Sequence, residues 1–293
     1  MKGKKILVTG GAGFIGSHLC NHLLREGAEV LAVDNLFVGR EELVPEGAEF
    51  KRVDICSPKI RDVIAEFYPD IVVHLAAVHY IPYCNAHPEE TFEVNVMGIR
   101  NVVEAAGDRL FLFASSAAVY PVSDEPLKED VRPGPMDIYG KTKLVGEDIV
   151  KLMNKNAVIA RIFNVYGPND TNPHLIPEVV RQVNNGSRKI ELGNLTPKRD
   201  YIHVDDVCRA LIALLKNGEG GVYNVGTGRE HSVKKVVKIV SEILGEEIES
   251  KQDKSRMRKV DREHLLADIS KLRGIGWKPK VRFEDGLRKL IWL

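Results

Sequence analysis

The sequence predicts an α/β protein with a doubly wound parallel sheet, and three observations lead to this prediction. Short apolar runs alternate with segments of helical periodicity through residue 163. The runs are nearly continuous in apolar residues, as strands are when helices cover both faces of a parallel sheet. The first run, residues 6–8, passes through glycines into residues 14–24, whose apolar positions recur at helical spacing.

Composition limits the classes of function that are open to the chain. Its 293 residues suffice for one large or two modest domains, and 44% hydrophobic with 28% charged residues is ordinary for a globular protein. The formal net charge of +1 provides no overall field for nucleic acid or membrane. Four scattered cysteines without CxxC spacing predict reduced thiols in a cytoplasm, with no metal site or disulfide framework. We recognise no signal peptide and no apolar run of about 18 residues that could span a membrane.

The glycine turn after the first strand has the spacing of a dinucleotide-binding loop. Gly11-x-Gly13-x-x-Gly16 fits that pattern, and Gly10 gives a second match with Gly13 and Gly16. The first turn of a helix carries backbone N–H groups without partners and the positive end of the helix dipole. A pyrophosphate can bind there if no side chain blocks its approach. The sequence therefore predicts a Rossmann-type site at Gly10, Gly13 and Gly16, with Phe14 and Ile15 opening the helix.

An acidic residue ends the second strand about 20 residues beyond this loop, where a ribose-binding carboxylate belongs. Asp34 is expected to accept hydrogen bonds from the adenosine ribose hydroxyls and to repel a 2′-phosphate. This position favours NAD over NADP. The competing interpretation is a tight turn followed by a solvated aspartate.

Further elements follow in order. We expect strands at residues 50–55, 70–77, 109–114 and 157–163, and helices at 59–67, 88–106 and 139–154. Beyond residue 163 the rhythm changes, and we expect a loop at 164–171, strands at 189–192 and 222–226, and helices at 176–184, 204–216, 233–244 and 283–290. Residues 199–203 lead into the helix at 204–216. This predicts a cofactor domain over residues 1–165 and a smaller C-terminal lobe over 166–293, with segments near 201–228 returning to the sheet.

Candidate catalytic residues follow the fifth strand. Ser116 ends that strand, at the sheet edge that also carries the glycine loop. Tyr139 and Lys143 are four residues apart on one face of a predicted helix. A phenol with a pKa near 10 is a poor base, and we expect a nearby ammonium and the cofactor's positive ring to lower that pKa. Ser116 would hold a substrate hydroxyl and guide its proton to Tyr139.

The chain resembles the extended branch of the short-chain dehydrogenase/reductase family, the nucleotide-sugar epimerases and dehydratases. The resemblance covers nearly the whole chain. It rests on the glycine loop, Asp34-Asn35, Asp54-Ile55, His74 to Ala77, Asn95-Val96, Ser115-Ser116, Tyr139-x-x-x-Lys143, Arg161 to Pro168, Arg199 to Asp206 and Asn224 to Gly228.

The resemblance implies roles for residues that spacing alone does not identify. Cofactor contacts are implied for Asn35, Asp54, Ile55, Leu75, Ala76, Ala77 and Asn95, with Asp54 and Ile55 beside the adenine. Contacts with the diphosphate of a nucleotide sugar are implied for Asn164, Arg199 and Arg258. Residues 79–84 depart from the family pattern, and we expect them to form a loop beside the pocket from which His79 could touch the sugar. Competing interpretations are that Asp54 caps a helix, Asn95 packs on a helix face, Arg258 belongs to a solvated basic run and His79 lies on a surface loop.

Within the family, the residues after the serine favour one reaction. Dehydratases and decarboxylases carry acidic residues there, whereas this chain has Ala117 and Ala118, which can move no proton. We therefore expect 4-epimerisation of the UDP-glucose/UDP-galactose type through a 4-keto intermediate. The alternative is a reductase of GDP- or dTDP-4-keto-6-deoxy sugars, because Leu192-Gly193-Asn194 and Arg256-x-Arg258-x-x-Asp261 resemble the GDP-mannose branch.

Two other classes of function, an NAD-sensing regulator and an RNA-binding protein, are less consistent with the sequence. A non-catalytic NAD-sensing regulator would not need the intact Ser116, Tyr139 and Lys143. An RNA-binding relative would be expected to carry a basic stripe interleaved with aromatic residues, which this sequence lacks. The family resemblance implies a homodimer formed by the helices at 88–106 and 139–154.

Overall fold

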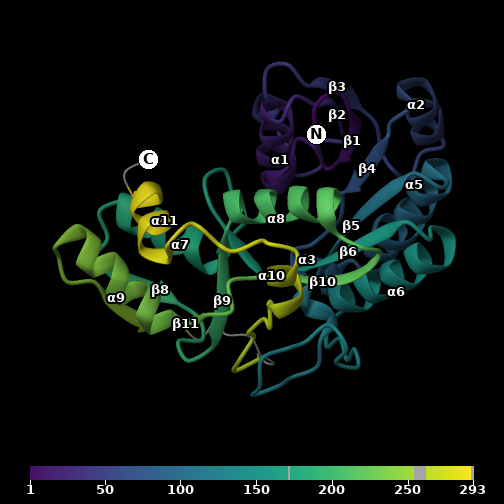
Figure 1. Ribbon diagram of the computed structural model, residues 1–293. Coiled ribbons are helices and arrows are strands. Elements are labelled where there is room, and N and C mark those ends of the chain that lie inside the picture. Colours follow the sequence, from purple (N-terminus) through teal and green to yellow (C-terminus); the bar gives the residue numbers. More distant parts are fainter. Residues whose placement is uncertain (171, 254–261, 292–293) are drawn as a thin grey trace.

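A seven-stranded parallel sheet lies at the centre of the computed structural model, which describes residues 1–170, 172–253 and 262–291 (Figure 1). Every pair of neighbouring strands in this sheet is parallel, which confirms the predicted doubly wound fold. In sheet order the strands are β10 (Gly221–Val225), β6 (Ala157–Ile162), β5 (Leu110–Ser116), β4 (Ile71–His74), β1 (Lys5–Thr9), β2 (Glu29–Asp34) and β3 (Glu49–Arg52).

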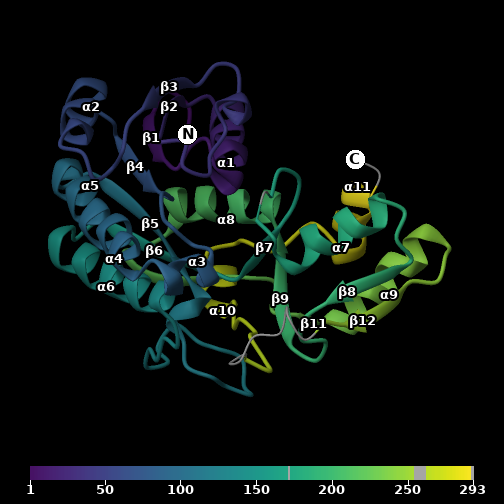
Figure 2. The ribbon, with the colours of Figure 1, turned by 180° about the vertical axis from the view of Figure 1, so that it is seen from behind.

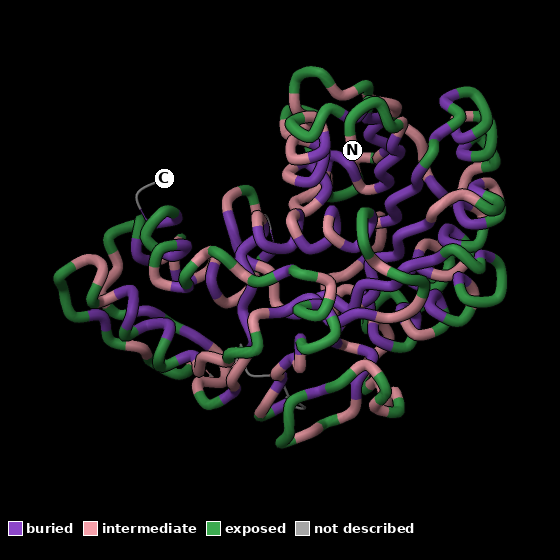
Figure 3. The backbone as a smooth tube through the Cα atoms, viewed as in Figure 1, coloured by how far each residue is buried: buried purple, intermediate pink, exposed green. Residues whose placement is uncertain are grey.

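Helices cover both faces of this sheet, so alternate residues of each strand enter two separate apolar cores. Ile6 and Val8 of β1 pack on one face with residues of α1 and α8, whereas Leu7 packs on the other with residues of α2, α5 and α6. Figure 3 shows the buried strands enclosed by more exposed turns. The helices are α1 (Phe14–Arg25), α2 (Lys59–Phe67), α5 (Ile99–Ala106), α6 (Ile138–Met153) and α8 (Val204–Asn217).

The strand order reverses between β1 and β4, and this reversal determines where a ligand can bind. The chain runs outward from β1 through β2 to β3 and then crosses back to β4, β5 and β6. The connections on the two sides of the reversal diverge, and they leave a crevice outside the carboxyl ends of the strands. The glycine loop follows β1 directly, so it lies at this crevice.

A smaller lobe stands beside the sheet (Figures 1 and 2). Its three-stranded sheet has the order β11, β9, β7, and a separate parallel pair joins β12 to β8. A third apolar core lies between these strands and three helices. The elements are β7 (Asn164–Tyr166), α7 (Leu175–Asn184), β8 (Lys189–Leu192), β9 (Lys198–His203), β11 (Glu230–Ser232), α9 (Val233–Leu244), β12 (Glu249–Gln252) and α11 (Phe283–Ile291), while the short α10 (Ser270–Gly274) lies against β10.

Three segments differ from the sequence-based expectation. Residues 164–171, predicted as a loop, begin with β7. The predicted helix at 88–106 is present but changes its hydrogen bonding, from α4 (Pro88–Phe92) through a π-helical turn η2 (Glu93–Gly98) into α5. Residues 79–84, predicted as a loop, enter a helix, α3 (Ile81–Ala86), because Pro82 in its first turn has the fixed φ that a helix start requires. Within the described part of the chain, every helix is too short or too polar to cross a membrane.

Candidate active site

One large cavity lies between the carboxyl ends of the parallel strands and the lobe. Its volume is about 1510 Å³, whereas a site for one small molecule typically measures roughly 300–1,000 Å³. The glycine loop and the ends of β2, β3, β4, β5 and β6 line one side, and α7, β9 and the residues after β8 line the other. The cavity is therefore large enough for two ligands that meet inside it.

The glycine loop has the geometry that a pyrophosphate requires. Gly10 has φ +72°, which residues other than glycine rarely adopt, and its N–H donates to Val33 O at 2.8 Å. A Cβ at Gly16 would lie 1.9 Å from Gly10 O, so only glycine fits that close approach. Helix α1 begins after Gly13 with no side-chain cap and no acidic residue in its first turn. Its first N–H groups therefore stay available to an anion.

Asp34 lies at the end of β2 on the cavity wall, as the sequence predicts. Its carboxylate accepts hydrogen bonds from Ala12 N at 3.1 Å and Leu36 N at 2.8 Å. Burial raises the pKa of Asp34, and these backbone N–H groups oppose the shift. An ionised carboxylate has about four acceptor sites, so two bonds leave capacity for ribose hydroxyls.

Asn35 and Asp54, which come from different loops, are joined by a hydrogen bond. Asn35 Nδ2 donates to Asp54 Oδ2 at 2.9 Å, and Cys56 N donates to Asp54 Oδ1 at 2.7 Å. Burial tends to raise the pKa of Asp54, but these two donors hold it below its usual value. Ile55 lines the cavity next to Asp54. The structure thus brings together the residues that were expected around the adenine.

The turn after β4 forms the cavity wall next to the glycine loop. Leu75, Ala76 and Ala77 all line the cavity. Leu75 N donates to Thr9 O at 3.1 Å, and Ala76 N would lie 2.8 Å from a Cβ at Gly10. The small side chains of the two alanines leave room at the centre of the site.

Asn95 is not among the residues that line the cavity, and its expected cofactor contact stays a prediction. The side chain is buried within the π-helical turn and its polar atoms are used inside the protein. Its amide accepts from Val78 N at 2.8 Å and donates to Val78 O at 2.8 Å and Thr142 Oγ1 at 3.0 Å. Asn95 therefore fixes the wall before His79 to the helix that carries Tyr139.

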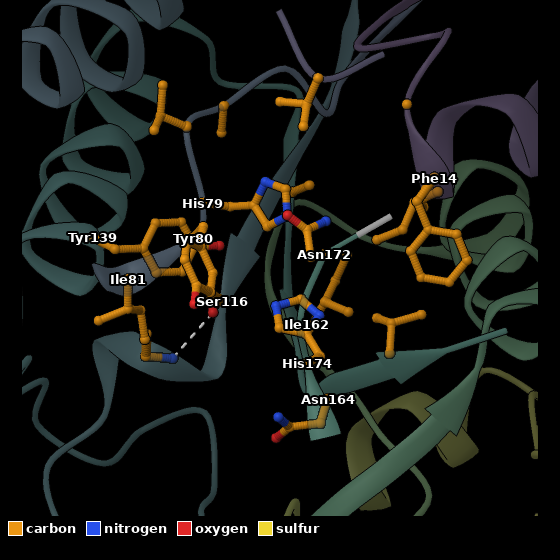
Figure 4. A pocket seen from close by; sticks show the side chains of 18 of the residues that line it. Phe14, His79, Tyr80, Ile81, Ser116, Tyr139, Ile162, Asn164, Asn172 and His174 are labelled. Atoms are coloured by element: carbon orange, nitrogen blue, oxygen red, sulfur yellow. Dashed lines mark hydrogen bonds between the residues drawn. The ribbon is translucent and has the colours of Figure 1, made fainter. Parts of the chain in front are cut away.

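Ser116, Tyr139 and Lys143 meet at the centre of the cavity wall. Ser116 Oγ accepts a hydrogen bond from Ala118 N at 3.1 Å, and Figure 4 shows its side chain next to Tyr139. Asp137 caps the start of α6 by accepting from Gly140 N at 2.7 Å. Lys143 Nζ lies one turn later, 5.9 Å from the centroid of the Tyr139 ring.

Burial shifts the pKa values of both Tyr139 and Lys143 in the protein without cofactor, and the expected lowering of the Tyr139 pKa beside a positive nicotinamide stays a prediction. Lys143 is buried, its Nζ donates to Ala114 O at 2.8 Å, and burial lowers its pKa to about 7. Burial also raises the pKa of Tyr139, and only hydrogen bonding with the Ser116 side chain lowers it. The protein without ligand therefore holds the phenol neutral, because desolvation outweighs the hydrogen bonding with Ser116.

The residues expected to bind substrate enter the cavity from both sides. Asn164 Oδ1 is buried and has no hydrogen-bond partner among the described residues. Arg199 lines the cavity and donates from Nη1 to the carbonyls of Lys198 and Arg262, both at 2.8 Å. His79 is partly buried and neutral at physiological pH, because burial lowers its pKa to about 4. Arg258, also expected at the diphosphate, lies outside the described residues.

Several cavity residues had no signal in the sequence. His174 stands 6.2 Å from His79 between ring centroids, and its Nδ1 is 3.3 Å from Asp170 Oδ2. Figure 4 shows His79, Asn172 and His174 grouped opposite Ser116 and Tyr139. Arg262 is buried in the wall and contacts the turn that follows Ser116. These groups are brought together only by the fold, because they come from loops without a motif.

Comparisons with known proteins agree with this geometry. A sequence profile described as the NAD dependent epimerase/dehydratase family matches residues 6–226. The UDP-glucose 4-epimerase of Lactobacillus helveticus is 31% identical over 318 residues, covering 98% of this chain and 96% of the relative. The GDP-6-deoxy-D-mannose reductase of Pseudomonas aeruginosa is 28% identical over 306 residues, covering 98% of this chain and 96% of that relative.

Solved structures of nucleotide-sugar epimerases are also similar to this chain. The crystal structure of the Thermus thermophilus UDP-glucose 4-epimerase in complex with NAD matches with a TM-score of 0.90 at 34% identity. The match covers 98% of this chain and 97% of the other. The similarity therefore extends over both the large sheet and the lobe.

Proposed function

The chain belongs to the NAD-dependent epimerase/dehydratase family, and we propose that it inverts the C4 hydroxyl of a nucleotide-diphosphate sugar of the UDP-glucose/UDP-galactose type. One observation carries this proposal. A single cavity joins the glycine loop, the Ser116–Tyr139–Lys143 group and the lobe residues Asn164 and Arg199. A sugar carbon and a dinucleotide can therefore meet at Tyr139.

The residues present fit NAD. The loop at Gly10, Gly13 and Gly16 has no space for a Cβ at Gly10 or Gly16 and offers N–H groups to the pyrophosphate, while Asp34 offers acceptors to the ribose hydroxyls. NAD, when bound, supplies a nicotinamide ring that can accept a hydride from a sugar carbon and return it. The same carboxylate would repel a 2′-phosphate, which supports NAD over NADP.

Tyr139 acts as the proton-transfer group at the C4 hydroxyl in this proposal. Ser116 holds the hydroxyl by a hydrogen bond, and Lys143, when protonated, stabilises the phenolate. Each unit by which the pKa of Tyr139 is lowered corresponds to about 1.4 kcal/mol of stabilisation of the phenolate relative to the phenol. Because burial alone keeps the phenol neutral, the protein gains a working base only when positive charge is close to the ring.

Inversion at C4 requires the sugar to present both faces to the same tyrosine. Tyr139 removes the hydroxyl proton as the 4-ketone forms and returns a proton after the ketone has turned over. Ala117 and Ala118 follow Ser116 and cannot assist elimination of water or loss of a carboxyl group. In this proposal Arg199 and Asn164, which both line the cavity, hold the diphosphate while the ketone turns over, since an arginine fork can pair with phosphate oxygens.

A reductase of GDP- or dTDP-4-keto-6-deoxy sugars is the second candidate. It is supported by the similarity to the GDP-6-deoxy-D-mannose reductase over nearly the whole chain. Both candidates use the same Tyr139 and Ser116, and they differ in the net redox change of the sugar. A reductase consumes one reduced cofactor per product, whereas an epimerase consumes none.

The deciding experiment asks whether product formation consumes a reduced cofactor. The purified protein is incubated with UDP-glucose without added cofactor, and the sugar products are identified by NMR. Formation of UDP-galactose supports the epimerase. Turnover of GDP- or dTDP-4-keto-6-deoxy sugar only when NADH or NADPH is added would support the reductase and contradict the proposal.

We also propose a homodimer. Apolar side chains stand exposed on α6 and on the preceding helical segment: Val145 is 37% exposed, Leu152 85%, Phe92 40% and Met97 46%. A second copy of these helices would cover them. Light scattering at micromolar concentration tests the dimer, and a monomer mass there would contradict it. A cytoplasmic location is also proposed, since all four cysteines are free thiols.

A further inference from the structure

Arg262 carries a buried guanidinium in the wall of the cavity. The residue is 8% exposed and lines the cavity between the lobe and the large sheet. Its Nη1 donates to Ala117 O at 3.2 Å and its Nη2 to Ala118 O at 3.1 Å. Both acceptors lie 144 or 145 residues away in sequence, so only the fold creates this contact.

The two carbonyls belong to η3 (Ala117–Val119), the short 3₁₀ turn that directly follows Ser116. Ala117 O also accepts a hydrogen bond from Tyr120 N at 3.2 Å within the turn, so Arg262 adds a second donor to this oxygen. The planar arginine fork reaches Ala117 O and Ala118 O at the same time. Ala118 is held from both sides, since its carbonyl accepts from Arg262 while its N–H donates to Ser116 Oγ at 3.1 Å. A shift of this turn would therefore move the serine hydroxyl.

The same turn contacts the helix of Tyr139. A Cβ at Gly140 would lie 2.5 Å from Ala118 O, so the start of α6 and the turn are in direct backbone contact. Arg262 thus binds a turn that touches both the Ser116 side chain and the residue next to Tyr139. Arg262 contacts two carbonyl oxygens of this turn, and through the turn it can act on the catalytic pair.

The backbone of Arg262 is fixed to the lobe. Arg199 Nη1 donates to Arg262 O at 2.8 Å. The residues before and after Arg199 in β9 also donate hydrogen bonds to the segment that follows Arg262. Lys198 N donates to Glu263 O at 2.8 Å, and Asp200 N donates to Leu265 O at 2.9 Å. A displacement of β9 would consequently be transmitted to the guanidinium.

We propose that Arg262 is a positioning residue, which holds the turn after Ser116 in its working geometry and links that turn to the strand carrying Arg199. The proposal rests on the proposed function, in which Ser116 and Tyr139 act on the sugar. Occupation of the lobe by a diphosphate at Arg199 would then steady the serine, so that the catalytic pair is best aligned when the substrate is bound.

The first test compares Arg262→Gln and Arg262→Lys with Arg282→Gln, a control on an arginine whose side chain is 77% exposed. Rates of C4 inversion of UDP-glucose are expressed per bound NAD, so unfolded protein does not count. Losing the charged fork should lower kcat roughly tenfold or more for Arg262→Gln, with a smaller loss for Arg262→Lys and none for the control. KM should stay nearly constant. An unchanged kcat, or a raised KM with normal kcat, would overturn the proposal.

The second test asks whether Arg262 acts through Ser116. In a Ser116→Ala background, Arg262→Gln should cause little further loss, because the serine hydroxyl it positions is already gone. If the two substitutions instead lower kcat by factors that multiply in the double variant, Arg262 does not act through Ser116 and the proposal is wrong.

A third measurement needs no substrate, so it tests the positioning role of Arg262 even if the proposed function is wrong. The Tyr139 phenolate is titrated by absorbance in the NAD-bound protein, with the matching Tyr139→Phe protein subtracted. Because hydrogen bonding with Ser116 lowers the pKa of Tyr139, Arg262→Gln should raise the observed midpoint. An unchanged midpoint would overturn the positioning role, whereas inactivity of the wild type on all nucleotide sugars would overturn only the proposed function.

Discussion

The two sides of the cavity are built in different ways. On the sheet side, backbone groups at the ends of neighbouring strands dominate, above all the N–H groups of the glycine loop. On the lobe side, side chains from separate segments converge, among them Asn164, His174, Arg199 and Arg262. Backbone geometry suits a reactant that never changes, while side chains on loops can be altered to suit another substrate. The sheet side therefore suits an invariant cofactor, and the lobe side suits a substrate that can differ between proteins.

Tyr139 lies at the boundary between the two sides, and its replacement should have the largest effect. Tyr139→Phe removes one oxygen and should lower kcat by roughly 10²- to 10⁴-fold, the usual contribution of a positioned acid–base group. The content of bound NAD should not change, since the glycine loop and Asp34 are untouched. Product formation and cofactor content are measured on the same sample. Full activity of this variant would remove Tyr139 from the mechanism.

The backbone character of the sheet side can be tested at Gly16. Gly16→Ala places a Cβ 1.9 Å from Gly10 O, where no side chain can yield. Overpacking of this kind costs about 3 kcal/mol at the upper end of its usual range, so NAD should bind roughly 100-fold more weakly. Gly274→Ala is the matched control, because nothing lies within 4 Å of its Cβ. Equal NAD affinity in both variants would contradict a backbone cradle.

The lobe side should respond in substrate affinity and not in cofactor affinity. Arg199→Gln removes a charged donor from the expected diphosphate site, which should raise KM for UDP-glucose roughly 10- to 100-fold. NAD affinity should stay at the wild-type level. Titration calorimetry with UDP and with NAD separates the two effects. A variant that loses NAD and keeps UDP would reverse the assignment of the two sides.

The same contrast explains how much could be predicted from the sequence. The glycine loop, Asp34 and Ser116 follow strands directly, so their places are fixed by the local order of strand, turn and helix. Tyr139 and Lys143 share a helix face by spacing alone. For these residues, the short-range pattern already implies the position at the sheet edge.

The remaining features depend on contacts that spacing does not encode. Asn95 was expected in the cofactor cleft, but the π-helical turn directs its amide to Val78 and Thr142. The burial that raises the pKa of Tyr139 in the protein without cofactor is a property of the folded site, which spacing does not show. Arg262 was missed because its partners are more than 140 residues away in sequence.

Each half of the molecule also contains a buried ionisable group, and the two pKa values move in opposite directions. His74 of β4 lies between Phe111 and Phe113 and its Nδ1 is 2.8 Å from Thr9 Oγ1; burial lowers its pKa to about 3. Asp200 of β9 is fully buried, and burial raises its pKa to about 6 although four donors partly oppose this. Folding therefore favours the neutral form of both groups.

These shifts predict opposite pH dependence in the two halves. The stability that neutral His74 provides is complete above its unfolded pKa of about 6.5 and is lost as the pH falls toward 3. The stability associated with protonated Asp200 is complete below about 3.8 and is lost as the pH rises through 6. Between pH 6 and pH 5, acidification should weaken the sheet side and strengthen the lobe side.

Urea unfolding of His74→Asn and Asp200→Asn should reveal this opposition as the smallest effect. On going from pH 6 to pH 5, the wild type should lose about 1 kcal/mol of unfolding free energy relative to His74→Asn, because the variant has no ring to protonate. It should gain about 1 kcal/mol relative to Asp200→Asn, because the variant has no carboxyl to neutralise. Packing losses in each variant cancel, since they are the same at both pH values. If the unfolding free energy of the wild type shifts in the same direction relative to both variants, the pKa values of His74 and Asp200 are not shifted in opposite directions, which would contradict the prediction.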